Sequence, residues 1–243
     1  MHLLSVALGF VIGLALGLLG GGGSILTVPV FVYVLGFGPK ESIAMSLAVV
    51  GVTSLAGAAG HWRQGHVKIR VALIFGSVAM AGSYLGTRLA TRLTGAEQLT
   101  IFGTVMVVAA GFMLRGVRSD EGPRASLPVP ITAAVGLVVG TLTGLVGVGG
   151  GFLIVPALVW AGLQMVDAIG TSLLTIVMNC AVGFYGYVGQ VQIAWVPMAL
   201  VTAGTLPGIA TGTYATRFVP PRHLRRAFAV LILCVAVYIL VRR

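Results

Sequence analysis

Charge is scarce in this sequence, and acidic residues are the scarcest. Only 8% of its 243 residues are charged, and Asp and Glu together number five, whereas 58% of the residues are hydrophobic. A water-soluble domain needs a largely polar and charged surface, which this composition cannot supply. The sequence therefore excludes an ordinary soluble enzyme or binding domain and predicts an integral membrane protein.

Other classes are excluded by missing patterns. Segments that alternate polar and apolar residues are lacking, which excludes a β-barrel, and long apolar runs such as 73–86 and 227–241 suit helices that cross about 30 Å of hydrocarbon. Cys180 and Cys234 lie inside apolar segments, so we expect neither a disulfide framework nor a metal site. Motifs of hydrolases, metalloproteases and P-loop enzymes are absent. We expect an all-α polytopic membrane protein that is not an enzyme and has no cofactor.

A glycine-rich stretch occurs twice. Residues 9–29 read GFVIGLALGLLGGGGSILTVP and residues 136–156 read GLVVGTLTGLVGVGGGFLIVP, with 11 identities in 21 positions at an offset of 127. Further matches follow at an offset of 126, for example Gly86-Thr87 with Gly212-Thr213. These matches indicate a duplicated unit.

The duplication predicts two repeats, over 1–118 and 126–243, each with five helical segments. Because five is odd, the second repeat is expected to be inverted in the membrane relative to the first. The second segment of each repeat is too short to cross at about 1.5 Å per residue, so it is predicted to be broken or re-entrant. The expected segments are 3–20, 24–35, 41–60, 67–93 and 98–114, then 130–147, 151–161, 167–188, 195–218 and 223–241.

The 15 basic residues are spread unevenly over the two sides of the predicted topology. One side receives ten and the other five, so the positive-inside rule places the ten in the cytoplasm and both termini outside. His61, Arg63 and His66 are interpreted as loop residues on the cytoplasmic side. The basic residues form no extended face, so nucleic acid is not an expected partner.

Glycines form two patterns in each copy. Gly9, Gly13 and Gly17 recur every four residues and give a smooth helix face for close packing. The next glycines interrupt the helix, and the following helix begins with N–H groups that lack partners and carry about half a positive charge. Two inverted breaks would point these donors at a small anion near the midplane, although the glycines could instead only permit the bend. The candidate residues are Gly22, Gly23 and Ser24 in the first copy and Gly149, Gly150 and Gly151 in the second.

Polar residues gather in the third segment of each repeat, one or two helical turns apart, so that they can share a face. Hydroxyl and amide groups donate hydrogen bonds without a fixed charge, which suits reversible binding of an oxyanion. Hydrogen bonds between helices are the alternative role, and for the cysteine it is packing as a small apolar side chain. The candidates are Ser46, Thr53, Ser54, Ser172, Asn179 and Cys180, with Asn179 the first choice for mutation.

Three charged residues are candidates for coupling or gating. Glu41 and Asp167 begin the third segments, where a carboxylate complements the helix dipole. Proton coupling is their alternative role. Arg88 ends the long fourth segment, where it either reaches outward to the interface or guides anions.

The motifs GLLGGGGSILTVP (17–29) and GLVGVGGGFLIVP (144–156), each near the start of one repeat, resemble the sulfite exporter TauE/SafE family of membrane transporters. The resemblance covers essentially the whole chain. It implies a permease of the inner membrane that moves sulfur-containing anions such as sulfite or sulfoacetate, often outward. Ser24 stands where the second copy has Gly151, so the two half-sites need not be equivalent.

The leading hypothesis is a secondary transporter, an exporter of a sulfur oxyanion that works by alternating access. An anion channel is the nearest alternative, and a membrane-embedded structural or accessory subunit is another. The expected partners are the anion, with proton coupling left open, and membrane lipid. Oligomer formation is left open as well.

Overall fold

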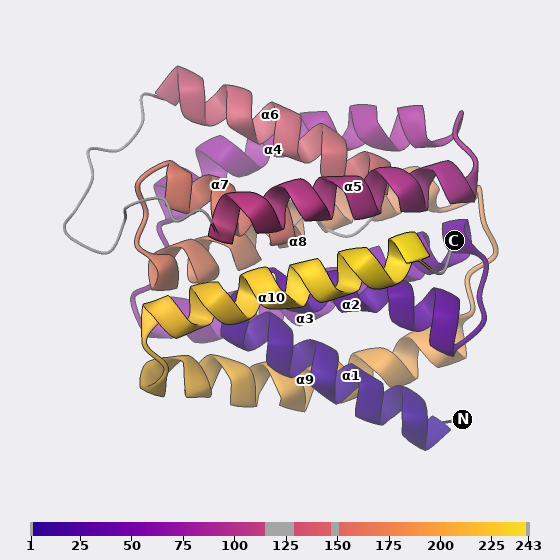
Figure 1. Cartoon of the computed structure of the whole chain (residues 1–243), viewed down its shortest axis with the longest axis horizontal. Coiled ribbons are helices and arrows are strands. Elements are labelled where there is room, and N and C mark those ends of the chain that lie inside the picture. The colour runs from indigo at the N-terminus through magenta and orange to yellow at the C-terminus, as the bar shows by residue number, and fades with distance from the viewer. Residues whose placement is uncertain (1, 115–128, 147–150, 242–243) are drawn as a thin grey trace.

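The computed structural model describes residues 2–114, 129–146 and 151–241, and these residues are almost entirely helical (Figure 1). Most helices run lengthwise beside one another, and α1 begins at the same end of the bundle at which α10 ends. The elements are α1 (His2–Leu19), α2 (Gly22–Pro29), the π-helix η1 (Val30–Val34), α3 (Pro39–Arg63), α4 (Ile69–Ala90), α5 (Gly95–Leu114), α6 (Val129–Val146), α7 (Gly151–Trp160), α8 (Met165–Tyr187), α9 (Trp195–Ala215), the 3-10 helix η2 (Thr216–Phe218) and α10 (Pro221–Val241).

The predicted all-α membrane fold is confirmed, with one helix for each expected segment. Within the described residues, α1, α3, α4 and α8 are long and apolar enough to cross a bilayer. The short second segments are α2 and α7, with 8 and 10 residues. After α2 the chain continues in the wider turns of η1, because Pro29 lacks an N–H and its ring crowds the preceding turn.

The glycine stripes bring pairs of helices together backbone to backbone. A methyl group on Gly13 of α1 would collide with the carbonyl group of Thr205 on α9. A methyl group on Gly140 of α6 would collide with the carbonyl group of Ala79 on α4 in the same way. The four-residue glycine spacing therefore serves close helix packing. The first helix of each half lies against the fourth helix of the other half.

Contacts between the halves are reciprocal. α1 packs along α9 and α6 along α4, while the third helices α3 and α8 pack on each other, as do the fifth helices α5 and α10. Exchanging the halves leaves this pattern unchanged, as in a pseudo-two-fold arrangement. α1 and α6 begin at opposite ends of the bundle and run in opposite directions (Figure 1). The boundary between 118 and 126 stays a prediction, because residues 115–128 lie outside the described part of the chain.

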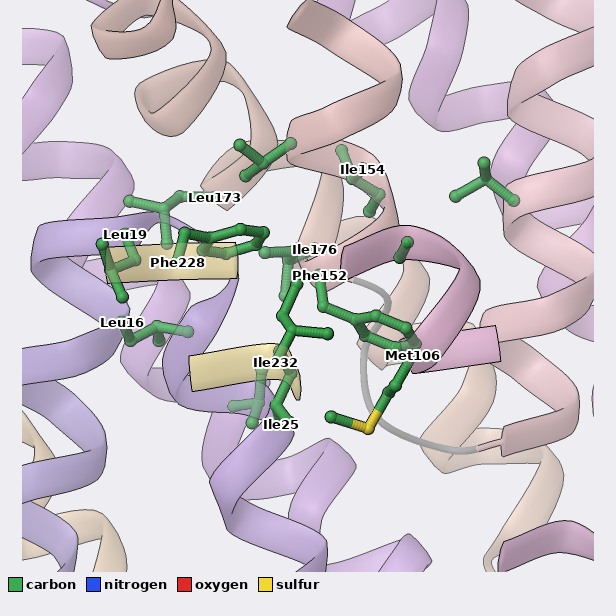
Figure 2. Close-up of a cluster of buried hydrophobic side chains, with 14 of the residues drawn as sticks. Leu16, Leu19, Ile25, Met106, Phe152, Ile154, Leu173, Ile176, Phe228 and Ile232 are labelled. Atoms are coloured by element: carbon green, nitrogen blue, oxygen red, sulfur yellow. The ribbon is translucent and has the colours of Figure 1, made fainter. Parts of the chain in front are cut away.

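Buried apolar side chains surround the two short segments. Figure 2 shows Ile25 of α2 and Phe152 of α7 among side chains from α5, α8 and α10, including Met106, Ile176 and Phe228, and all five are fully buried. Since lipid is as apolar as these side chains, close packing and not exclusion of water favours this arrangement in a membrane. The core holds α2 and α7 inside the bundle and so fixes the position of the glycine breaks.

Candidate functional site

The first glycine break contacts the first residue of α7. Between α1 and α2, Gly20 has φ +71°, a conformation that strains a residue with a side chain. A methyl group on Gly21 would collide with the backbone of Gly151, the first residue of α7. The starts of α2 and α7 therefore lie next to each other. Gly149 and Gly150 lie outside the described residues.

The other candidates at the first break contact helix backbone. Ser24 Oγ donates a hydrogen bond to the carbonyl oxygen of Gly21 at 2.6 Å, so this hydroxyl hydrogen is in use. Gly23 faces α1, where a methyl group would collide with the carbonyl of Ile12. Gly22 is the first residue of α2, and the first N–H groups of a helix have no partner within it. An anion at this break would therefore bind main-chain N–H groups and not the Ser24 hydroxyl.

Of the three candidates in α3, two donate hydrogen bonds to backbone carbonyls. Ser46 Oγ donates to the carbonyl of Ile43 at 2.9 Å. Thr53 Oγ1 donates to the carbonyl of Val49 at 2.6 Å and lies 2.6 Å from Oγ1 of Thr205 on α9, so it links two helices. Ser54 is fully buried, and its Oγ has no partner among the described residues. Ser54 is therefore the α3 hydroxyl that is available to a ligand.

α8 carries the second set of candidates. Ser172 Oγ donates to the carbonyl of Ile169 at 2.8 Å and lies beside the first break, 3.0 Å from a methyl group on Gly20. Cys180 packs where α3 crosses α8, with its Cβ 3.1 Å from a methyl group on Gly51. The thiol therefore sits in a tight helix contact.

Asn179 has the least satisfied side chain of the set. It is 1% exposed, and neither Oδ1 nor Nδ2 has a hydrogen-bond partner in the described part of the chain. A methyl group on Gly151 would lie 2.7 Å from Cδ1 of Ile176, one turn before Asn179, so the amide is within a turn of the second break. An unpaired buried amide costs about 1–3 kcal/mol, so hydrogen bonds to a ligand would be favourable at Asn179.

The two carboxylate candidates lie in the first turns of α3 and α8. Asp167 is paired on both oxygens: Oδ2 lies 3.1 Å from Nζ of Lys68 and Oδ1 lies 3.1 Å from Nδ1 of His66. Both partners belong to the loop between α3 and α4. Glu41, the counterpart of Asp167, has no ion pair with any described residue. The equivalent carboxylates therefore differ in their surroundings.

Arg88 lies on the outer face of α4. Its guanidinium donates to the hydroxyl oxygen of Tyr84 at 2.8 Å and sits 5.2 Å from the centre of that ring. The pair is exposed and one helical turn apart. This geometry agrees with a side chain that reaches outward and places Arg88 away from the breaks.

Two apolar hollows open on the sides of the bundle. One of 520 Å³ is bordered by α5, α6 and α7, including Pro156 and Trp160. One of 250 Å³ is bordered by α2, η1 and α10, including Pro29 and Tyr33. Pro29 matches Pro156 and Tyr33 matches Trp160 at the offset of 127, so the two hollows occupy equivalent places in the two halves. Their walls offer almost no hydrogen-bond donors, so we do not assign an anion to them.

The interpretation of His61 and Arg63 as loop residues is wrong. α3 continues to Arg63, and His61 is fully buried, with Nε2 3.4 Å from the carbonyl oxygen of Gly17 near the end of α1. A signal was available in the sequence: His61 follows Ser54 by seven residues, or two helical turns, which places both on one face.

Gln98 is a second buried polar residue that sequence reasoning missed. Its Nε2 donates to the carbonyl of Leu145 near the end of α6 at 3.0 Å and to the hydroxyl of Tyr187 at 3.1 Å. Tyr187 occupies the position equivalent to His61, at an offset of 126. A polar side chain therefore bonds near the end of the first helix in each half. It is His61 at the end of α1 and Gln98 at the end of α6.

Known proteins resemble the chain over nearly its full length. The family described as sulfite exporter TauE/SafE matches residues 5–239. A probable membrane transporter protein of Xylella fastidiosa (strain 9a5c) is 36% identical over 256 residues, which cover 99% of this chain and 95% of that protein. The probable membrane transporter proteins YdhB of Bacillus subtilis (strain 168) and MJ0441 of Methanocaldococcus jannaschii are each 24% identical, over 90% and 91% of this chain and 91% and 89% of their own lengths. No solved structure matches.

Proposed function

The chain belongs to the sulfite exporter TauE/SafE family and is a multi-pass membrane transporter, and on this basis we propose that it moves a small sulfur-containing oxyanion, such as sulfite, sulfoacetate or another organosulfonate, by alternating access. The observation that carries the proposal is the contact between Gly21 and Gly151, with the unpartnered side chains of Ser54 and Asn179 on the helices beside it. Export across the inner membrane, with both termini outside, is part of the same proposal.

The donors at this place suit such an anion. The N–H groups that begin α2 and α7 carry partial positive charge, and a sulfur oxyanion has several oxygens that accept hydrogen bonds. The Asn179 amide can donate two hydrogen bonds and the Ser54 hydroxyl one. None of these groups carries a full charge, so the anion can bind and leave again. One side chain comes from each half, which supports a binding site between the halves.

The arrangement of the halves supports alternating access. Ser54 and Asn179 are buried, so a site between them is closed to both sides in this structure. α1 of the first half packs against α9 of the second, and α6 of the second packs against α4 of the first. The two halves can therefore exchange equivalent helix contacts. Because the first helices run in opposite directions, such an exchange would turn an opening on one side into an opening on the other.

Purified protein in proteoliposomes tests the proposal with sulfite, sulfoacetate, thiosulfate and sulfate, each with and without a pH gradient. We expect saturable uptake and counterflow of at least one anion, and reduced uptake for Ser54→Ala. Ser77→Ala is the matched control, because it removes an exposed hydroxyl that bonds to its own helix. An ohmic, unsaturable current would identify a channel. Absence of flux for every anion, with folded protein, would indicate a non-transporting subunit.

A further inference from the structure

His61 has a free basic nitrogen in the interior of the bundle. Its Nε2 faces the carbonyl oxygen of Gly17, which can only accept a hydrogen bond, so Nε2 carries the ring hydrogen. Nδ1 then presents a lone pair, and it has no partner among the residues described. The side chain is fully buried. His61 can therefore take up a proton on Nδ1 without breaking its contact with α1.

Thr213 of α9 packs against Gly60, the residue before His61, and its hydroxyl is also unsatisfied. A methyl group on Gly60 would lie 3.1 Å from Cγ2 of Thr213, and a methyl group on Gly17 would lie 2.7 Å from its backbone nitrogen. Thr213 is 5% exposed, and its Oγ1 has no partner in the described ranges. The equivalent Thr87 donates to the carbonyl of Ser83 at 2.8 Å, so only one end of the bundle has this free hydroxyl.

A hollow of 370 Å³ at this end of the bundle lies next to the pair. Its lining includes Gln64, His66, Thr216 and Arg217. Gln64 follows His61 by three residues and Thr216 follows Thr213 by three. These two lining residues are therefore about one helical turn further outward than His61 and Thr213. The guanidinium of Arg217 is always charged and attracts anions to the hollow.

Among the described residues, no free carboxylate lies near His61. In the described part of the chain, the charged and titratable groups near this end of α3, on the helix itself and on the elements packed against it, are Arg63, His66, Lys68, Asp167, Tyr214 and Arg217. Asp167 is the only carboxylate among them and is already paired with Lys68. Glu41 and Glu97 belong to the other end, where a methyl group on Gly95 would contact Pro39. A buried imidazolium without a counterion is costly, and an anion would remove that cost.

We propose that the transported oxyanion binds between His61 and Thr213 on its way through this end of the bundle, and that His61 takes up one proton with it. The proton comes from water in the hollow and binds Nδ1, which then donates to an oxygen of the anion, as does Thr213 Oγ1. When the anion leaves, the proton returns to water. This inference rests on the proposed function and adds a proton-linked subsite at one end.

The pH dependence of sulfoacetate uptake between about pH 5.5 and 8 tests the proposal, because this anion stays ionised over that range while the supply of protons changes. In wild-type proteoliposomes, KM should rise by about thirtyfold or more from the lower to the higher pH, because each anion binds together with one proton. In His61→Gln, KM should stay constant within about twofold, because the titrating group is gone. Thr213→Val should raise KM about fivefold at every pH, because one hydrogen bond is lost.

Tyr187→Phe at the equivalent position and His66→Gln in the hollow are the matched controls, and both should keep the wild-type pH profile. A wild-type KM that does not change with pH, or an unchanged profile in His61→Gln, would overturn the proposal. A flat profile in His66→Gln alone would assign the proton to His66 and overturn it as well. Failure of the wild type to transport any anion at any pH would reject the proposed function itself, and the subsite with it.

Discussion

Asn179→Leu should stabilise the protein and abolish transport at the same time. Both polar atoms of the Asn179 side chain are unpaired at 1% exposure, and leucine has the same branching and number of heavy atoms without polar atoms. An unpaired buried amide costs about 1–3 kcal/mol in water-soluble proteins, while polar groups between membrane helices contribute about 0.6 kcal/mol on average and 1.7 at most. We therefore expect a gain of about 0.5–2 kcal/mol, which corresponds to a rise in Tm of about 1–8 °C for a chain of this size.

The measurement is thermal unfolding in detergent together with anion uptake in proteoliposomes. Thr211→Val is the control, because Thr211 is exposed and its hydroxyl bonds only to its own helix. It should change stability by less than about 0.5 kcal/mol and leave transport intact. Destabilisation of Asn179→Leu by more than about 1 kcal/mol would mean that the amide has a structural partner. Transport at the wild-type rate would remove Asn179 from the anion site.

Two further predictions follow from helix contacts. Gly21→Ala should lower the free energy of unfolding by at least about 3 kcal/mol or prevent folding, because its methyl group would collide with the backbone of Gly151. Gly111→Ala is the control: its methyl group meets nothing within 4 Å, so it should raise the free energy of unfolding by about 0.5–1 kcal/mol. Expression and Tm measure both, and equal effects would contradict the contact between the breaks. In a double-mutant cycle, Thr53→Val and Thr205→Val should show a coupling of about 0.5–1.5 kcal/mol, and strict additivity would mean that the two hydroxyls do not bond.

The helices could be predicted from the sequence because their signals are local. An apolar run of sufficient length predicts a membrane helix wherever it occurs, and a glycine-rich break predicts the ends of α1 and α2. The short α2 and α7 follow from the same counting of residues. The sequence predicts a third segment that ends at Gly60. In the structure Gly60 gives room to Thr213 of α9, and the helix continues three residues further.

The state of each candidate side chain could not be predicted, because it depends on the neighbouring helix. Thr53 and Ser54 are adjacent polar residues of the same chemical type in the sequence. Thr53 meets Thr205 of α9 and is bonded, whereas Ser54 meets no described partner and is free. In the structure α1 pairs with α9 and α4 with α6. The spacing of residues within one segment carries no information on which helices pair.

The two halves differ at the site, and this difference explains why Asn179 lacks a partner. Thr53 and Asn179 occupy equivalent positions, at an offset of 126, and Thr53 is held by Thr205 of α9. The residue equivalent to Thr205 is Ala79 of α4, which packs against the glycine stripe of α6 as Thr205 packs against that of α1. Alanine cannot form a side-chain hydrogen bond, so α4 cannot hold the amide as α9 holds Thr53. If the halves exchange contacts during transport, the amide stays available to the anion in both states.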